Sequence, residues 1–245
     1  MKLSIVIPMR NEAENVDMLV REVDTACRDI PDKELILVDD GSTDKTAQQI
    51  RDMQLEVPWL RLLQHAPAGG QSAAVHSGVQ AARGQIVCTL DGDLQNPPGE
   101  IPNLIAPFDA PYALGNLGLV AGQRIRRQDT WVKRAGSKCA NTLRAWMLDD
   151  DTRDTGCGLK AFKRDAFLEL PFFNHMHRYL PALFKRQGYA VHHVDVSHRE
   201  RGGGASKYTN VQRALAGIHD LIGVAWLMKR AKTVRATEAA PPARD

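Results

Sequence analysis

Short apolar segments alternate with amphipathic segments over the first hundred residues, and this alternation limits the folds open to the chain. Candidate strands span 3–7, 34–38, 60–63 and 86–90, and candidate helices span 11–28, 44–53 and 71–82. The apolar segments are rich in Val, Ile and Leu, which is typical of strands buried on both faces. Strands that alternate with helices pair in parallel through right-handed crossovers. The sequence therefore predicts an α/β fold with a mainly parallel sheet and helices on both faces.

The pattern after residue 97 is less regular. Prolines at 97, 98, 102, 107 and 111 interrupt it, so regular repetition is expected to stop there. Further strands are expected over 119–121, 158–162 and 190–196, and further helices over 131–148, 175–186 and 211–228. Ser42 or Thr43 is expected to cap the helix over 44–53. These elements predict a domain over 1–210, a membrane-proximal or packing helix over 211–232 and a disordered tail over 233–245.

Polar residues gather where the expected strands end. The strand over 86–90 leads into Asp91-Gly92-Asp93-Leu94-Gln95, and the first two strands lead into Pro8-Met9-Arg10-Asn11-Glu12 and Asp39-Asp40-Gly41-Ser42. In an open α/β sheet, ligands bind at the carboxyl ends of the strands. Two carboxylates one residue apart suit Mg²⁺ or Mn²⁺, whose remaining positions go to water and substrate phosphate. An ordinary Asp-Gly turn is the competing interpretation of the pair taken alone.

Composition and motifs count against several classes of protein. A net charge of +3 is too small to indicate nucleic-acid binding. The loop after the first strand contains no glycine, which disfavours a G-x-G-x-x-G dinucleotide site. A phosphorylatable receiver module also pairs acids at strand ends, but it is shorter and would leave the basic segments unused. No uncharged run reaches the ~18 residues of a spanning helix, the first strand is too short for a signal peptide, and the cysteine spacing suits a reducing cytosol.

Five motifs occur in an order that resembles a known family. They are P-x-R-N-E at 8–12, V-D-D-G-S at 38–42, D-G-D-L-Q at 91–95, D-T-G-C-G-L-K at 154–160 and R-x-x-G-x-S-K-Y at 201–208. This order resembles the family 2 glycosyltransferases, and more narrowly the polyprenyl-phosphate glycosyltransferases of the dolichol-phosphate mannosyltransferase type, from about residue 3 to residue 210. The resemblance implies a Rossmann-like GT-A fold. It also implies a metal-dependent, inverting transfer of a sugar from a nucleotide-diphosphate sugar to a polyprenyl phosphate.

The resemblance implies roles for individual residues. Pro8, Arg10, Glu12 and Asp40 match positions that line a base and ribose pocket, although many relatives carry Tyr in place of Arg10; Asp39 is either a further ligand or a structural acid. Asp91, Asp93 and Gln95 match positions that hold the metal and the diphosphate, and Arg124 matches a phosphate-binding arginine. Asp154 matches an acid that either orients a basic partner or meets the sugar hydroxyls. Lys133 and Ser137 match an Arg/Ser pair, with Arg134 as the alternative to Lys133, and Arg201, Ser206 and Lys207 are expected to face phosphate. The candidate catalytic residues are Asp91, Asp93, Arg124, Asp154 and Arg201.

The implied chemistry needs positioning and charge more than a base. A polyprenyl monophosphate is already anionic at neutral pH, so no general base has to deprotonate it. A metal at the donor diphosphate stabilises the leaving charge, while Arg and Lys neutralise and orient the acceptor. The transition state is expected to resemble an oxocarbenium ion, with no covalent nucleophile. His175, His177, His192 and His193 lack acids or cysteines at ligand spacing, so structural or surface roles are expected for them.

The segment after residue 210 is a candidate for membrane contact. Apolar residues recur there at helical spacing, and Trp226 and a basic group over 229–235 follow. An interfacial helix on anionic lipids and a helix that packs on the domain both fit this pattern. Some relatives continue into spanning helices at this point. We therefore expect a peripheral enzyme on the cytoplasmic face of the membrane, with an integral membrane partner downstream.

Two alternatives and several details stay open. A family 2 transferase that acts on a polysaccharide or soluble acceptor fits the same motifs. A non-catalytic membrane-recruitment subunit fits the fold, but it would have no use for a metal site. Mannose is the default sugar of the resembled family, and the sequence does not choose between GDP and UDP, identify the sugar or give the oligomeric state.

Overall fold

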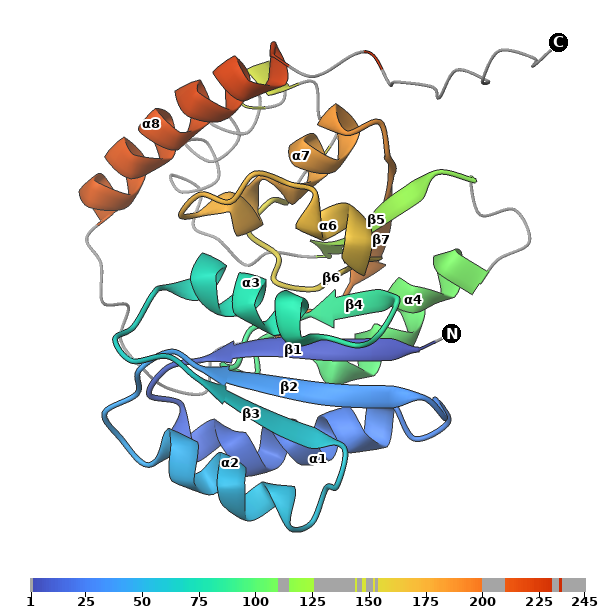
Figure 1. Cartoon of the computed structure of the whole chain (residues 1–245), viewed down its shortest axis with the longest axis vertical. Coiled ribbons are helices and arrows are strands. Elements are labelled where there is room, and N and C mark those ends of the chain that lie inside the picture. Colours follow the sequence, from blue (N-terminus) through green and yellow to red (C-terminus); the bar gives the residue numbers. More distant parts are fainter. Residues whose placement is uncertain are drawn as a thin grey trace, which may run out of the picture.

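The helices and strands of the chain form an α/β fold (Figure 1). The computed structural model describes residues 2–109, 115–125, 144, 147–148, 152, 154–199, 210–230 and 234, and only the backbone of residues 210–216. The strands are β1 (Leu3–Met9), β2 (Lys33–Asp39), β3 (Leu60–Gln64), β4 (Ile86–Thr89), β5 (Leu117–Arg124), β6 (Lys160–Lys163) and β7 (Ala190–Val196). The α-helices are α1 (Val16–Ala26), α2 (Thr46–Gln54), α3 (Gln71–Ala81), α4 (Ile101–Asp109), α6 (Arg164–Leu168), α7 (Leu180–Arg186) and α8 (Asn210–Met228). Three 3-10 helices accompany them: η1 (Ala13–Asn15), η2 (Pro98–Glu100) and η3 (Met176–Arg178).

The seven strands form one sheet in the order β3-β2-β1-β4-β6-β5-β7. All neighbouring strands are parallel except the pairs of β6, which runs antiparallel to both β4 and β5. The predicted, mainly parallel sheet is therefore confirmed. Because β6 is reversed, it begins at the edge where β1, β2, β4 and β5 end. The segment that leads into β6 is thereby placed beside the carboxyl ends of the other strands.

Helices cover both faces of the sheet, as the apolar strands predict. On β1, Leu3, Ile5 and Ile7 belong to the core cluster shared with α1, α2 and α4, while Val6 belongs to the cluster shared with α3, α6 and α7. Burial of alternate side chains in opposite layers is expected for a central parallel strand. Helix α8 lies on the outside of the second layer, against α7 (Figure 1).

The structure differs from the sequence pattern in the proline-rich segment. Helix α4 is present there although it contains Pro102 and Pro107. Pro102 lies in the first turn, where the backbone N–H that proline lacks has no intrahelical acceptor. Pro107 lies near the last residue, so few turns follow the bond that it removes. Regular alternation therefore continues one helix further than the prolines suggest.

Two predicted helix ends are also corrected. Neither Ser42 nor Thr43 caps α2: Asp44 Oδ1 accepts a hydrogen bond from the Thr46 backbone N–H at 3.0 Å, and Ser42 Oγ instead accepts one from Asn11 N–H at 2.9 Å. The segment over 175–186 is not one helix, because η3 and α7 are separated at Tyr179.

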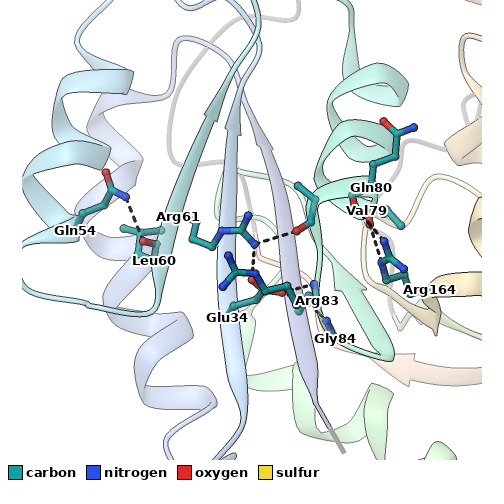
Figure 2. Close-up of polar contacts among 11 residues, drawn as sticks. Glu34, Gln54, Leu60, Arg61, Val79, Gln80, Arg83, Gly84 and Arg164 are labelled. Carbon is teal, nitrogen blue, oxygen red and sulfur yellow. Dashed lines mark hydrogen bonds and ion pairs between the residues drawn. The ribbon is translucent and has the colours of Figure 1, made fainter.

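A buried carboxylate ties the strands together at the amino edge of the sheet, opposite the ends discussed below (Figure 2). Glu34, at the start of β2, is 5% exposed and accepts hydrogen bonds from Ser4 Oγ at 2.6 Å, Arg83 N–H at 2.5 Å and Arg61 Nη1 at 2.5 Å. The Gly84 N–H completes the network by donating to Ser4 Oγ at 2.8 Å. Three strands and the end of α3 are thus joined through one side chain.

Within the described residues, no helix combines the length and hydropathy needed to cross a bilayer. The helix predicted over 131–148 falls largely outside the described residues, although Arg144, Met147 and Leu148 are helical. The glycine loop at 202–204 and all of the tail except Val234 in its 233–245 range also lie outside them. The division at residues 210 and 232 stays a prediction.

Candidate functional site

A cleft of about 460 Å³ lies at the carboxyl edge of the sheet, and we call it the central cleft. Its polar lining comes from elements far apart in the sequence. The side chains used below are Gln71 from α3, Asp91 after β4, Arg124 from β5, Asp154 from the segment before β6, Lys160 from β6, and His177 and Arg178 from η3. Pro8 of β1 also lines the cleft.

Asp91 is the acid of the D-G-D motif that faces the central cleft. Its Oδ1 accepts a hydrogen bond from Gln71 Nε2 at 2.8 Å, and its Oδ2 accepts one from Asn96 Nδ2 at 3.1 Å. Both donors are neutral amides. Burial and the charge of Asp93 raise the pKa of Asp91, and Lys160 and Arg124 do not offset them. A carboxylate that feels the charge of a second acid favours the binding of a divalent cation.

The surroundings of the acid pair fit a metal that is completed by substrate. Within the described residues, no group of three or more His, Cys, Asp or Glu side chains is arranged to hold a metal ion. In general, Mg²⁺ can bind through one or two carboxylates and take its remaining ligands from water and substrate phosphate. Asn96, 2% exposed, has a buried Oδ1 without a hydrogen-bond partner among the described residues, while its amide N–H orients Asp91. An oriented acid next to an unsatisfied oxygen is a suitable environment for a cation.

Glycine 158 allows the segment before β6 to reach Asp91. Thr89 Oγ1 donates to the Gly158 carbonyl at 3.1 Å, which fixes this segment against the end of β4. A Cβ at position 158 would overlap the Asp91 carboxylate. The second glycine of D-T-G-C-G-L-K, Gly158, is therefore needed for the close approach of this motif to Asp91.

Arg124 and Asp154 form a bidentate ion pair at the other side of the acid. Arg124 Nε donates to Asp154 Oδ2 at 2.5 Å, and Arg124 Nη2 donates to Oδ1 at 2.8 Å. These hydrogen bonds, which outweigh burial, raise the pKa of Arg124. Of the two roles predicted for Asp154, the structure shows the pairing with a basic residue, and contact with sugar hydroxyls stays a prediction. Arg124 keeps further N–H donors for a phosphate, since a guanidinium carries five.

Lys160 is a buried basic residue of the central cleft. It is 4% exposed, its backbone lies between Thr89 of β4 and Ala121 of β5, and its Nζ donates to the Cys157 carbonyl. Burial lowers the pKa of Lys160, although Cys157, Asp91 and Asp154 favour its charged form. The motif that contains this lysine was visible in the sequence, but a lysine inside a short strand gave no sign that it would face a cleft.

His177 joins η3 to α3 at the wall of the cleft. Its Nδ1 is 2.7 Å from Ser72 Oγ, next to Gln71. Burial, followed by the charges of Lys160 and Arg178, lowers the pKa of His177 to about 3, so the ring is neutral at physiological pH. His177 lines the central cleft, and the structural or surface role expected for it stays a prediction. Arg178 is a cleft residue that the motifs did not indicate.

Asp40, one of the residues predicted to line a base and ribose pocket, is hydrogen-bonded to the loop that precedes α3. Asp40 Oδ1 accepts hydrogen bonds from Gly69 N–H at 2.7 Å and lies 2.7 Å from His65 Nδ1, while Oδ2 accepts one from Gly70 N–H at 2.8 Å. Burial opposes ionisation, but these hydrogen bonds outweigh it and lower the pKa of Asp40. Asp39 has a structural contact, since its Oδ1 accepts from Ser42 N–H at 3.1 Å.

The remaining predicted residues stay predictions. Arg10 is exposed, Glu12 Oε2 accepts a hydrogen bond from Asn15 Nδ2 at 2.6 Å, and Asp93 Oδ1 accepts one from Gln95 N–H at 3.2 Å. Of the described candidates, Pro8, Asp91, Arg124 and Asp154 line the central cleft; Arg10, Glu12, Asp40, Asp93 and Gln95 are not among its lining residues. Lys133, Arg134, Ser137, Arg201, Ser206 and Lys207 lie outside the described residues.

Comparison with known proteins agrees with this geometry. The family model described as glycosyl transferase family 2 matches residues 4–170. A dodecaprenyl-phosphate galacturonate synthase of Rhizobium johnstonii is 34% identical over 234 residues, which cover 94% of this chain and 68% of that protein.

Solved structures share the fold at low identity. Glucosyl-3-phosphoglycerate synthase from Mycobacterium tuberculosis, in complex with Mn²⁺, UDP-glucose and glycerol 3-phosphate, aligns with a TM-score of 0.66 at 20% identity, covering 94% of this chain and 80% of that one. Mannosyl-3-phosphoglycerate synthase from Rubrobacter xylanophilus aligns with a TM-score of 0.70 at 16% identity, covering 98% and 79%. These two likenesses show a common GT-A fold. The family match over most of the chain and the 34% identical relative show more: the chain belongs to glycosyltransferase family 2.

Proposed function

We propose that this protein transfers a sugar from a nucleotide-diphosphate sugar to a polyprenyl phosphate. The observation that carries the proposal is the central cleft, where the Asp91 carboxylate, whose pKa is raised, shares the lining with the basic side chains of Arg124 and Lys160. Asp154 is held by Arg124, and a histidine with a pKa of about 3 is a poor proton acceptor. An acceptor that arrives already ionised suits such a site, and the Rhizobium relative is named for a polyprenyl-phosphate product.

The donor half of the cleft is assigned to the acid pair. Asp91, Asp93 and Gln95 would hold a divalent cation, Mg²⁺ or Mn²⁺, which supplies positive charge to the departing diphosphate when bound. Gln71 and Asn96 orient Asp91, so that its oxygens are in place before substrate arrives. Pro8, Arg10, Glu12 and Asp40 are assigned to the base and ribose, with GDP and UDP both open.

The acceptor half is assigned to Arg124 and its partner. Asp154 fixes the guanidinium plane through two hydrogen bonds, and this leaves the other edge for a phosphate oxygen. Attack by that oxygen on the anomeric carbon, opposite the departing diphosphate, inverts the configuration. Arg201, Ser206, Lys207, Ser137 and one of Lys133 or Arg134 would complete the phosphate site.

Incubation of the full chain with UDP- and GDP-sugars tests the proposal. The acceptor arms are a short polyprenyl phosphate, the matching polyprenol, and soluble sugars. We expect a lipid-linked sugar only with the phosphate, and NMR of the product should show the anomeric configuration opposite to that of the donor. Transfer to the polyprenol or to a soluble sugar at the same rate would instead support a base-dependent family 2 transferase.

We further propose that α8 rests on the cytoplasmic face of a membrane that contains the lipid acceptor. Its outer side presents Ile218, Ile222 and Trp226, which are 57%, 60% and 58% exposed and recur at intervals of four residues. Its inner side packs on the domain through Val224, which is 2% exposed. Arg230 lies with its guanidinium carbon 5.1 Å from the Trp226 ring centroid. An apolar stripe with Trp and adjacent cations suits an anionic lipid surface.

Because the inner side of α8 packs on the domain, removal of the helix would uncover core residues. Substitution on the outer side is therefore the cleaner test of membrane contact. We expect Ile222→Ser combined with Trp226→Ser to reduce co-sedimentation with anionic liposomes by about tenfold, with unchanged thermal unfolding. Leu55→Ser, at an 87% exposed apolar residue at the end of α2, is the matched control. Equal sedimentation of all three proteins would remove this face from the proposal. An integral membrane partner that receives the product stays a separate proposal.

A further inference from the structure

Arg178 is a basic residue of the central cleft whose side chain has no hydrogen-bond or ion-pair partner among the described residues. It is partly buried in η3 and lines the cleft. The other two cations of the lining have partners, since Arg124 pairs with Asp154 and Lys160 donates to the Cys157 carbonyl. Among the described residues, no acceptor forms a hydrogen bond or ion pair with the Arg178 side chain. The N–H donors of its guanidinium are therefore available to an anion in the cleft.

The segment that carries Arg178 is held from both sides. His177 contacts Ser72 of α3 at 2.7 Å, so η3 is attached to the helix that also positions Asp91 through Gln71. On the other side, His175 Nδ1 lies 2.8 Å from Asp220 Oδ2 of α8. Tyr179 Oη also donates to the Gly217 carbonyl of α8 at 3.2 Å. A side chain on a segment fixed in this way is pre-organised for binding.

The backbone at the start of η3 has an uncommon conformation, which is consistent with a pre-organised segment. His175 has a φ of 69°, in the left-handed region that is uncommon for residues other than glycine. Its contact with Asp220 and the hydrogen bond from its own N–H to Asn174 Oδ1 at 3.0 Å hold it there. Strain that is fixed by surrounding contacts tends to occur at functional segments. Here it turns the chain so that both His177 and Arg178 reach the cleft.

We propose that Arg178 binds a substrate oxyanion other than the donor diphosphate. This inference rests on the proposed function, which brings two kinds of candidate anion into the cleft: the phosphate of the acceptor and, where the transferred sugar is a uronic acid, the sugar carboxylate. Both present two oxygens to the planar fork of a guanidinium. The neutral His177 beside it adds no competing charge. Arg178 is thus a further substrate-binding residue in the cleft, next to the Arg124 site.

Binding measurements on the full chain distinguish the acceptor phosphate from the sugar carboxylate as the anion that Arg178 binds. Calorimetry of wild type, Arg178→Gln and Arg178→Lys would use UDP, UDP-glucose, UDP-glucuronate, their GDP counterparts where available, and a short polyprenyl phosphate. If the sugar carboxylate is the ligand, Arg178→Gln should weaken the uronate donor by about 10- to 100-fold and spare UDP-glucose. If the acceptor phosphate is the ligand, the same loss should appear for polyprenyl phosphate, with all sugar nucleotides spared. Arg178→Lys should be intermediate, because it keeps the charge and loses the fork.

Kinetics and controls guard against a merely structural effect. In transfer assays, the KM for the affected substrate should rise more than kcat falls, and added guanidinium ion should restore part of the activity of Arg178→Ala. Arg51→Gln, at an exposed arginine of α2, is the matched control. Unchanged binding of both anions overturns the proposal. The proposal is also overturned if Arg178→Gln weakens the binding of UDP itself as much as that of the sugar nucleotides, because Arg178 would then bind the diphosphate. A wild type that binds these ligands but transfers no sugar would count against the proposed function, while the binding series would still report on Arg178.

Discussion

Two carboxylates at opposite edges of the same sheet have opposite electrostatic surroundings. Glu34, at the amino edge, accepts hydrogen bonds from a hydroxyl, a backbone N–H and the Arg61 guanidinium. Burial opposes its ionisation, but these donors outweigh burial and lower the pKa of Glu34. Among the described residues, Asp91, at the carboxyl edge, accepts hydrogen bonds from two amide donors and has a second acid nearby, and its pKa is raised although Lys160 and Arg124 oppose the shift.

The difference separates residues that stabilise the fold from residues that bind. A buried charge with matched donors favours the folded chain, whereas a buried charge without them disfavours it and is retained where a ligand supplies the missing partner. Asp40 follows the Glu34 pattern although it lies at the carboxyl edge, because its donors tie β2 to the start of α3. Position at the carboxyl edge is therefore insufficient by itself, and the balance of donors distinguishes Asp91.

The largest expected effect is that of Asp91→Asn on catalysis. Transfer should fall by at least about 10³-fold, because the leaving diphosphate loses its counter-charge. Without metal, the free energy of unfolding should stay the same or increase, because a carboxylate held against Asp93 is replaced by a neutral amide. Transfer rates and chemical denaturation measure the two effects. Asp109→Asn, at an exposed acid in α4, should change neither, and a less stable Asp91→Asn protein would contradict the comparison.

Glu34→Gln should show the reverse. The substitution removes the negative charge opposite Arg61 and turns one of the two acceptor oxygens into an NH2 donor, which should lower the free energy of unfolding by about 3 kcal/mol. Transfer should be retained at temperatures where the variant stays folded, because the residue lies at the far edge of the sheet from the cleft. Glu14→Gln, at an exposed residue without such contacts, should stay within about 0.5 kcal/mol of wild type. A large loss of kcat in folded Glu34→Gln protein would show that the two edges are coupled.

Metal should stabilise the protein through one edge only. A divalent cation that binds the folded chain at 100 times its Kd adds about 2.7 kcal/mol to the free energy of unfolding. Mn²⁺ or Mg²⁺ should therefore raise the Tm of wild type and of Glu34→Gln, and a chelator should reverse the shift and abolish transfer. Asp91→Asn should not respond. An equal rise in Tm for all three proteins would place the cation elsewhere.

Local sequence was sufficient for the sheet and for the acid pair. The apolar strands and the polar residues that follow them depend on neighbouring positions, so the parallel pairing and the Asp91-Asp93 motif were predictable. The reversed β6 was not predicted, since Lys160–Lys163 is too short to show its direction. Helix α4 was missed because the effect of a proline depends on the turn it occupies.

The rest of the cleft depends on contacts between distant segments. Asp91 meets Gln71 and approaches Gly158, and Ser72 meets His177 across 105 positions of the chain. Sequence motifs are defined by the spacing of nearby residues, so they do not include pairs that lie this far apart in the chain. The low pKa of His177 follows first from burial and then from the charges of Lys160, which lies on β6, and of the adjacent Arg178, so it could not be read from the sequence. The position of Arg178 in the cleft also depends on contacts between distant segments, so no motif indicated it.

The smallest expected effect is an opposite dependence of stability on pH at the two edges. The pKa of Glu34 is lowered on folding, so its contribution is fully present above the ordinary value of 4.5 and is lost as the pH falls through that value and below. The pKa of Asp91 is raised, so its ionised form costs stability at neutral pH, and the cost disappears as the pH falls towards the ordinary value of 3.8. Denaturation of both variants and wild type should be measured without metal between pH 7 and pH 4, at steps where all three stay folded. The deficit of Glu34→Gln should shrink in acid, and any gain of Asp91→Asn should shrink as well, each by at most about 1.4 kcal/mol per pH unit. A gain of Asp91→Asn that grows in acid would mean that the folded protein favours the ionised Asp91, and that this acid is satisfied in the same manner as Glu34.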